Sequence, residues 1–87
     1  MYSLAVKAGV DRTFRRMAKH DRTRLEAVEK KVAQILEDPH RFKPLRAPMQ
    51  GKRRVHVGPF VLIYEIDEEK KRVVLLDFEH HDTVYRR

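Results

Sequence analysis

Side chains that can bind an anion or move a proton recur in the segment from Lys52 to His56. In an extended strand, alternate residues share a face, so Lys52, Arg54 and His56 are expected to form one row spaced by about 6.6 Å. Arginine can grip two phosphate oxygens, and histidine can transfer a proton near neutral pH. The row therefore fits a phosphodiester site, and a solvated basic edge strand that resists aggregation is the alternative.

A second group of such residues lies near the C-terminus, where His80, His81 and Asp82 are followed by Tyr85. Adjacent histidines on an extended chain point to opposite sides, so only one of the two is expected to face any given site. Asp82 either orients a histidine or caps a turn. The Tyr85 ring can stack on a base and its hydroxyl can donate a hydrogen bond, or the side chain is a packed anchor.

Other kinds of site find little support in the sequence. The chain has no cysteine, which excludes a thiolate nucleophile, a thiolate metal ligand and a disulfide framework. A zinc site made from His56 and the pair His80-His81 would match no known metal-ligand spacing. Gly51 and Gly58 stand alone, so there is no glycine loop for phosphate. We therefore expect neither a metal nor a cofactor.

The elements that must position these residues can be read from hydrophobic periodicity. Residues 60–66 and 73–78 are nearly continuous apolar runs, which predict strands, and 60–66 is expected to be covered on both faces. With the alternating segment 52–57 they predict a three-stranded meander. Gly58-Pro59 predicts one tight turn, and the charged segment 67–72 predicts the other.

The N-terminal half predicts a short strand and two helices. Residues 2–7 alternate as a strand does, and Gly9 interrupts the pattern. Asp11 is the expected N-cap of a first helix, and Asp21 that of a second helix ending at Asp38-Pro39. The second helix carries an apolar stripe at helical spacing, made of Leu25, Val28, Val32, Ile35 and Leu36.

The order β-α-α-β-β-β predicts an α+β fold, with an antiparallel sheet and a helical hairpin packed on one face. The length of 87 residues suits one small domain spanning 1–87. The formal net charge of +7 indicates an anionic partner such as nucleic acid, an acidic protein or a membrane surface, or else a solubilising surface. A signal peptide and long apolar spans are both lacking, so we expect a soluble, cytoplasmic protein.

Three segments together resemble the RelE/ParE superfamily of toxins from toxin–antitoxin systems. Residues 51–58 are similar to the family's segment G-x-x-R-x-R-V-G, residues 60–64 to Y-R-x-x-Y, and residues 81–85 to R-x-x-V-Y. The resemblance covers nearly the whole chain and implies a small RelE-like fold. Histidines stand at two positions where the family has basic catalytic residues. In this respect the chain is more similar to the RelE-type branch that includes YafQ-like toxins.

This resemblance implies a ribosome-dependent endoribonuclease that cuts messenger RNA in the ribosomal A site. Cleavage in the family needs no metal, because the ribose 2′-hydroxyl attacks the adjacent phosphate. The resemblance also implies a cognate antitoxin whose segment wraps the toxin. The alternatives are a ParE-like inhibitor of DNA gyrase and a catalytically weakened RelE homologue that only binds its antitoxin.

The resemblance also implies roles for individual residues. His56 and His81 would exchange protons, Arg54 would bind the reacting phosphate, and Tyr85 would stack on or orient the substrate. The other basic side chains expected to bind RNA or phosphate are Lys52, Arg53, Lys43 and Arg46.

One position departs from the family pattern. The family often has an arginine directly after the aromatic residue of the middle strand, and this chain has Val61. Loss of one such charge-stabilising donor costs roughly 10²–10³ in rate. Either Lys52, Arg53 or Arg54 replaces it, or the enzyme is weak, or the chain no longer cleaves RNA.

Overall fold

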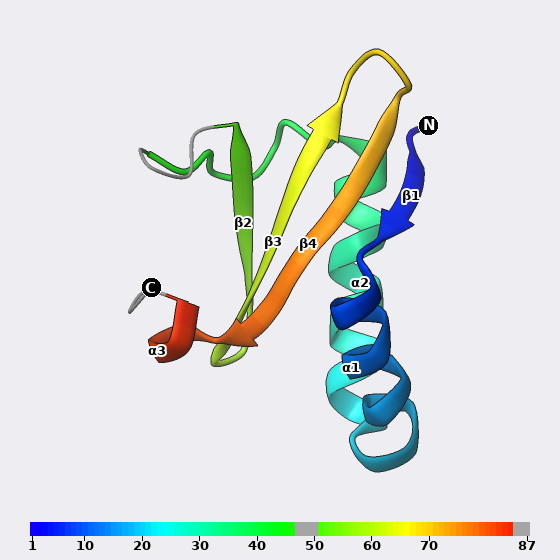
Figure 1. Ribbon diagram of the computed structural model, residues 1–87, viewed down its shortest axis with the longest axis vertical. Helices are drawn as coiled ribbons and strands as arrows, with labels where there is room; N and C mark the ends of the chain where they lie inside the picture. The colour runs from blue at the N-terminus through cyan, green and yellow to red at the C-terminus, as the bar shows by residue number, and fades with distance from the viewer. Residues whose placement is uncertain (47–50, 85–87) are drawn as a thin grey trace.

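The computed structural model describes residues 1–46 and 51–84 (Figure 1). Two helices cover one face of a sheet, and a short third helix follows the last strand on the other side. The elements in chain order are β1 (Ser3–Val6), α1 (Ala8–His20), α2 (Arg22–Glu37), β2 (Lys52–Val57), β3 (Phe60–Asp67), β4 (Arg72–His80) and α3 (His81–Val84).

The sheet has four strands in the order β1-β4-β3-β2. The meander β2-β3-β4 is antiparallel, as the sequence predicts. The expectation of a fully antiparallel sheet is wrong for β1, which pairs parallel to β4 from Ser3 opposite Arg72 to Val6 opposite Leu75. Alternation in a sequence identifies a strand but not its direction, which here follows from the path of the chain through the helices.

The first helix begins earlier than the sequence predicts. Lys7, with extended backbone torsions and no side-chain hydrogen bond, is the N-cap of α1, and Gly9 lies inside the helix. The expectation that Asp11 is the N-cap is therefore wrong, and its amide donates to the Lys7 carbonyl at 2.9 Å. Asp11 lies in the first turn, where a carboxylate is favoured by the helix dipole.

The second helix follows the sequence prediction closely. The Asp21 side chain accepts a hydrogen bond from the Arg24 amide at 3.3 Å, which confirms it as the N-cap. Val28 and Ile35 of the apolar stripe are buried against the sheet. None of the helices in the described part of the chain is long and apolar enough to cross a membrane.

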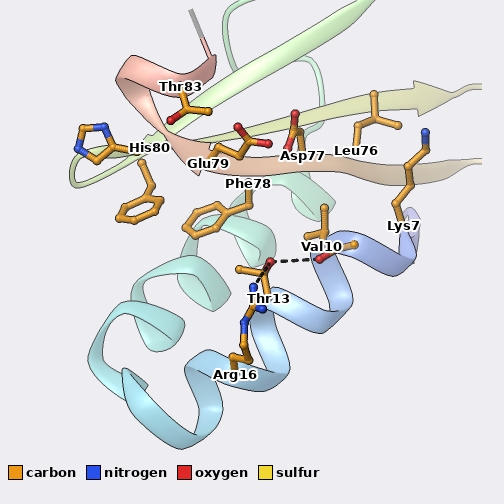
Figure 2. Close-up of a pocket in the computed structure, with 12 residues that line it drawn as sticks. Lys7, Val10, Thr13, Arg16, Leu76, Asp77, Phe78, Glu79, His80 and Thr83 are labelled. Carbon is orange, nitrogen blue, oxygen red and sulfur yellow. Dashed lines mark hydrogen bonds between the residues drawn. The ribbon is translucent and has the colours of Figure 1, made fainter. Parts of the chain in front are cut away.

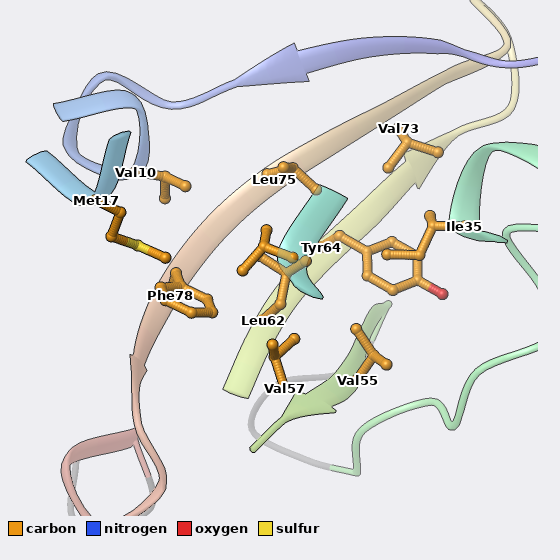
Figure 3. Close-up of a cluster of buried hydrophobic side chains, with 11 residues drawn as sticks. Val10, Met17, Ile35, Val55, Val57, Leu62, Tyr64, Val73, Leu75 and Phe78 are labelled. Atoms are coloured by element: carbon orange, nitrogen blue, oxygen red, sulfur yellow. The ribbon is translucent and has the colours of Figure 1, made fainter. Parts of the chain in front are cut away.

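The main core lies between the helical hairpin and the sheet (Figure 3). Leu62 and Tyr64 of β3 point into it and are fully buried. Val61 and Ile63 alternate to the opposite face and are also buried. The central strand is thus covered on both faces, as its apolar run predicts. The core side chains labelled in Figure 3 are Val10, Met17, Ile35, Val55, Val57, Leu62, Tyr64, Val73, Leu75 and Phe78.

Candidate functional site

The sheet face that points away from α1 and α2, called the open face below, carries the basic row of β2. Val55 and Val57 are buried in the core, so alternation places Lys52, Arg54 and His56 on the open face. In the antiparallel register His56 lies opposite Val61 and Arg54 opposite Ile63. The row is therefore built on the second, smaller apolar cluster of the molecule, which contains Val61 and Ile63.

The fold brings His56 and His81 together. Their ring centroids are 5.9 Å apart, with the ring planes inclined by 31°. His81 is the first residue of α3, and its amide donates to the Pro59 carbonyl at 2.9 Å, which holds this end of β4 against the β2–β3 turn. Nδ1 of His81 lies 3.5 Å from Oδ1 of Asp82. Two imidazoles from distant parts of the chain thus share one exposed site.

His80 faces away from this pair. Its ring meets the Phe60 ring edge-on at a centroid distance of 5.6 Å, and Phe60 stacks on Phe78 of the main core. Its Nδ1 accepts a hydrogen bond from the Asp82 amide at 3.2 Å. The expectation that only one of the adjacent histidines faces the site is met, and His81 is that one.

Helix α3 is an element that the sequence analysis does not predict. Val84 is buried on Val61 and Ile63, so one apolar side chain docks this turn on the open face. The buried Val61 lies directly opposite His56. The position at which the family often has an arginine is therefore beside the histidine pair, and in this chain it is apolar.

The surroundings of His56 favour its neutral form. Partial burial is the largest cause that lowers the pKa of His56 below its ordinary value, and the positive charge of Arg54 is the second. The neighbouring His81 lowers it further. A neutral imidazole can accept a proton, so this environment suits a general base.

A basic hollow adjoins Arg54. The segment 43–45 runs along the outer edge of β2, because the Arg54 amide donates to the Lys43 carbonyl at 3.2 Å and the Leu45 amide to the Lys52 carbonyl at 2.8 Å. The hollow has a volume of about 180 Å³ and is lined by Lys43, Pro44, Leu45, Arg46 and Arg54. Three cationic side chains from two segments therefore surround a space that fits an anionic group.

Arg53 is placed differently from its neighbours. It shares the parity of Val55 and Val57, and its Nη1 donates to the Phe42 carbonyl at 2.8 Å and to the His40 carbonyl at 3.3 Å. Its guanidinium thus ties down the loop after α2 rather than lying in the row on the open face, which departs from the expected phosphate-binding role. Tyr85 lies outside the described residues.

Two known proteins are similar to this chain in sequence over nearly its whole length. The chain is 44% identical over 86 residues to a protein of Methanosarcina mazei, and the match covers 98% of this chain and 100% of that protein. It is 36% identical over 88 residues to RelE4 of Methanocaldococcus jannaschii, and this match covers 100% of this chain and 94% of that protein.

Among solved structures, the toxin–antitoxin complex RelBE2 of Mycobacterium tuberculosis contains a similar chain. The TM-score is 0.77 at 27% sequence identity, and the match covers 92% of this chain and 98% of that chain. Residues 2–85 match the family model described as the ParE toxin of the type II toxin–antitoxin system parDE. The protein therefore belongs to the ParE toxin family of type II toxin–antitoxin systems, within the wider group of RelE-fold toxins.

Proposed function

We propose that this toxin is a ribosome-dependent endoribonuclease that cleaves messenger RNA through attack of a ribose 2′-hydroxyl on the adjacent phosphate. In this step a 2′-O–P bond forms and the P–O5′ bond breaks. One group must remove the proton of the 2′-hydroxyl, and another must protonate the departing 5′-oxygen. The observation that carries the proposal is the pair of imidazoles, His56 and His81, beside the guanidinium of Arg54.

His56 is the proposed general base, because its environment favours the neutral imidazole. His81 is then the proposed general acid, and Asp82 positions its ring through the 3.5 Å contact at Nδ1. Centroids 5.9 Å apart allow both rings to reach the two ends of one phosphodiester. This assignment makes the two histidines act on opposite sides of a single reacting phosphorus atom.

The negative charge that develops on the phosphate needs a cation. Arg54 is two residues from His56 on the same face and is the proposed partner of that charge, in place of the arginine that Val61 replaces. Lys52 and the basic hollow of Lys43 and Arg46 are proposed to bind neighbouring phosphates. The resemblance of residues 81–85 to the family motif supports Tyr85 as the residue that stacks on or orients the substrate.

The proposed substrate is messenger RNA in the ribosomal A site, which places the action of the toxin in the cytoplasm. The second proposed partner is a cognate antitoxin. Support comes from the similar chain in the toxin–antitoxin complex of M. tuberculosis and from the net charge of +7, which would speed association with an acidic segment. Co-expression with the product of the adjacent gene, followed by co-purification on a tag carried by that product, tests this partnership.

Primer extension on a message translated in a cell-free system tests the nuclease. The wild type is expected to cut inside codons, and His56→Ala, His81→Ala and Tyr85→Ala are each expected to reduce cutting, by roughly 10²–10⁴ for the two histidines. His20→Ala is the matched control, because His20 is an exposed histidine at the end of α1, away from the site.

Intact message with the wild type would overturn the nuclease proposal. A supercoiling assay with DNA gyrase would then test the ParE-like alternative. Cutting that persists in His56→Ala and His81→Ala would instead show a nuclease whose chemistry does not depend on the imidazole pair.

A further inference from the structure

The helical turn that carries His81 is too short to be stable by itself. Helix α3 has only four residues, and the first turn of a helix fixes several backbone torsions in exchange for very few internal hydrogen bonds. The first amides of a helix also have no hydrogen-bond partner inside it. The position of His81 must therefore depend on contacts that hold α3 from outside.

Contacts at both ends hold α3 in the described part of the chain. At its C-terminal end, Val84 is buried on the apolar cluster of the open face. At its start, the His81 amide donates to the Pro59 carbonyl at 2.9 Å, and the Asp82 amide donates to Nδ1 of His80 at 3.2 Å. His80 directly precedes the helix, and its side chain accepts from the amide two residues later, which is the geometry of an N-cap. An imidazole thus has the role that Ser, Asp or Asn usually has.

The ring of His80 is itself held by aromatic contacts. His80 lies opposite Phe60 in the pairing of β3 with β4, and the two rings meet edge-on at a centroid distance of 5.6 Å. Phe60 stacks on Phe78 of the main core at 5.1 Å, and the Arg24 guanidinium lies 4.5 Å from the centre of the Phe60 ring. These contacts connect the cap to the main core and restrict the directions in which Nδ1 can point.

His80 lies at the surface, where β4 passes into α3 (Figure 2). Together with Thr83 it lines a groove of about 580 Å³ between β4 and the first turns of α1, called the groove beside α1 below. The His80 side chain is 48% exposed, so its replacement leaves no buried cavity. Substitutions at His80 can therefore change the cap without unfolding the domain.

The cap reaches the histidine pair through a single residue. His80 binds the backbone amide of Asp82, and Oδ1 of the same Asp82 lies 3.5 Å from Nδ1 of His81. The other carboxylate oxygen of Asp82 lies 3.9 Å from Nδ1 of His80, beyond hydrogen-bond distance. Because the side chain of Asp82 is short, fixing its amide keeps its carboxylate beside His81, whose ring lies 5.9 Å from that of His56.

We propose that His80 is a positioning residue for RNA cleavage, whose imidazole caps α3 and so holds Asp82 and His81 in the arrangement that faces His56. The inference rests on the nuclease function proposed above. His80 acts through the backbone of α3 and the carboxylate of Asp82 rather than on the RNA. Nδ1 can accept a hydrogen bond only when it carries no proton, so the neutral tautomer with its proton on Nε2 is the one that forms the cap.

Substitutions that separate the hydrogen-bond acceptor from the packing of the ring test the inference. His80→Asn keeps the acceptor, because Oδ1 of asparagine is as many bonds from the backbone as Nδ1 of histidine, and asparagine is a favoured N-cap residue. His80→Leu keeps an apolar side chain against Phe60 but has no acceptor.

In the primer-extension assay, His80→Leu is expected to reduce cutting by roughly three- to thirtyfold, the range that follows from loss of one N-cap. His80→Asn is expected to recover most of that loss. His20→Leu is the matched control, because it makes the same change at an exposed histidine at the end of α1.

NMR at neutral pH measures the positioning itself, without the ribosome. Nuclear Overhauser contacts between the ring protons of His56 and His81 are expected in the wild type and in His80→Asn, and they are expected to weaken in His80→Leu. The Asp82 amide is expected to exchange with solvent faster in His80→Leu than in the other two proteins. Circular dichroism should be the same for all three, which separates a local change at α3 from a general loss of structure.

Two results would overturn the positioning role and leave the nuclease intact. One is cutting by His80→Asn that is as slow as cutting by His80→Leu, and the other is unchanged cutting and unchanged ring contacts in His80→Leu. Intact message with the wild type would overturn the nuclease and, with it, any part of His80 in cleavage. In that case the ring contacts and the Asp82 exchange would still decide whether His80 caps α3.

Discussion

At the scale of single residues, the site depends on what surrounds His56. Partial desolvation, the Arg54 guanidinium and the second imidazole, His81, each disfavour a positive charge on its ring. The same groups would surround a bound phosphate. Arg54 thus has two proposed effects: it keeps His56 neutral, and it balances the charge of the reacting phosphate.

The pKa of His56 can be predicted to respond to its neighbours. In the folded protein it lies below 6.5, and both Arg54→Gln and His81→Gln are expected to raise it, the first by more because Arg54 is the larger electrostatic cause. Titration of the His56 ring resonances by NMR checks this. His20→Gln should leave the pKa of His56 unchanged, and an unchanged pKa in Arg54→Gln would contradict the assignment.

A lowered pKa also links His56 to stability. The unfolded chain binds a proton at His56 more readily than the folded chain does, so protonation opposes folding. The neutral His56 ring should make its full contribution to the free energy of unfolding above pH 6.5. That contribution should decline as the pH falls from 6.5 toward the lower pKa of His56 in the folded state. Urea unfolding measures the free energy of unfolding of the wild type and of His56→Gln at several pH values. This decline below pH 6.5 is expected in the wild type only, and parallel plots of free energy against pH for the two proteins would contradict it.

At the scale of elements, the loop after α2 decides where the basic hollow lies. The Tyr64 hydroxyl, on the central strand, donates to the carbonyl of the buried Pro39 at 2.7 Å. Arg53 holds the next part of the loop through two carbonyls. These bonds bring the segment 43–45 to the edge of β2 beside Arg54. An arginine and a tyrosine with structural roles thus position cations proposed to bind RNA.

Tyr64→Phe is predicted to destabilise the fold by about 1–3 kcal/mol, because the Pro39 carbonyl would lose its partner in a buried position. Thermal or urea unfolding measures this. Tyr2→Phe is the control, since its exposed hydroxyl donates to Glu68, and it should change stability by no more than about 0.5 kcal/mol. Equal effects of the two variants would show that the buried bond contributes nothing particular.

At the scale of the whole molecule, charged side chains gather on two different surfaces. The open face carries the imidazole pair and the basic row, and the groove beside α1 is lined by Lys7 and Arg16 together with Asp77 and Glu79 of β4. Strand β4 separates them and contributes to both. The net charge of +7 is proposed to favour both anionic partners, the RNA and the antitoxin.

Binding of a single-stranded oligoribonucleotide is predicted to weaken steeply with salt, because bound phosphates release counterions. Lys43→Gln and Arg46→Gln should each reduce the slope of log affinity against log salt by about 0.7 if each contacts one phosphate. Fluorescence anisotropy over a range of potassium chloride concentrations measures the slope. Lys19→Gln, on α1, should leave it unchanged, and slopes unaltered in the hollow variants would place the RNA elsewhere.

Much of this fold could be predicted from the sequence, because the deciding interactions are local. The stripe of α2 repeats at helical spacing, Asp21 caps the helix through an amide three residues away, and the apolar run of β3 is long enough to be buried on both faces. The positive torsion of Gly58 fits the predicted turn. Strict alternation also separated the row of Lys52, Arg54 and His56 from the valines of β2.

The errors concern properties that no local pattern encodes. The direction of β1 depends on how the helical hairpin returns the chain, and the start of α1 at Ala8 depends on β1 passing into the helix without a separate turn. Composition groups Arg53 with its basic neighbours, whereas strand parity places it with Val55 and Val57. Its contacts with the loop carbonyls could only be seen once the loop was placed.

By itself the sequence determined the residue types available for chemistry and the elements that carry them. The tertiary structure decided which of them meet. It placed His81 and not His80 beside His56, and it docked α3 through Val84. The physical reason is that helical and strand periodicities arise from interactions a few residues apart, whereas the meeting of β2 with α3 follows from the burial of apolar side chains far apart in the chain.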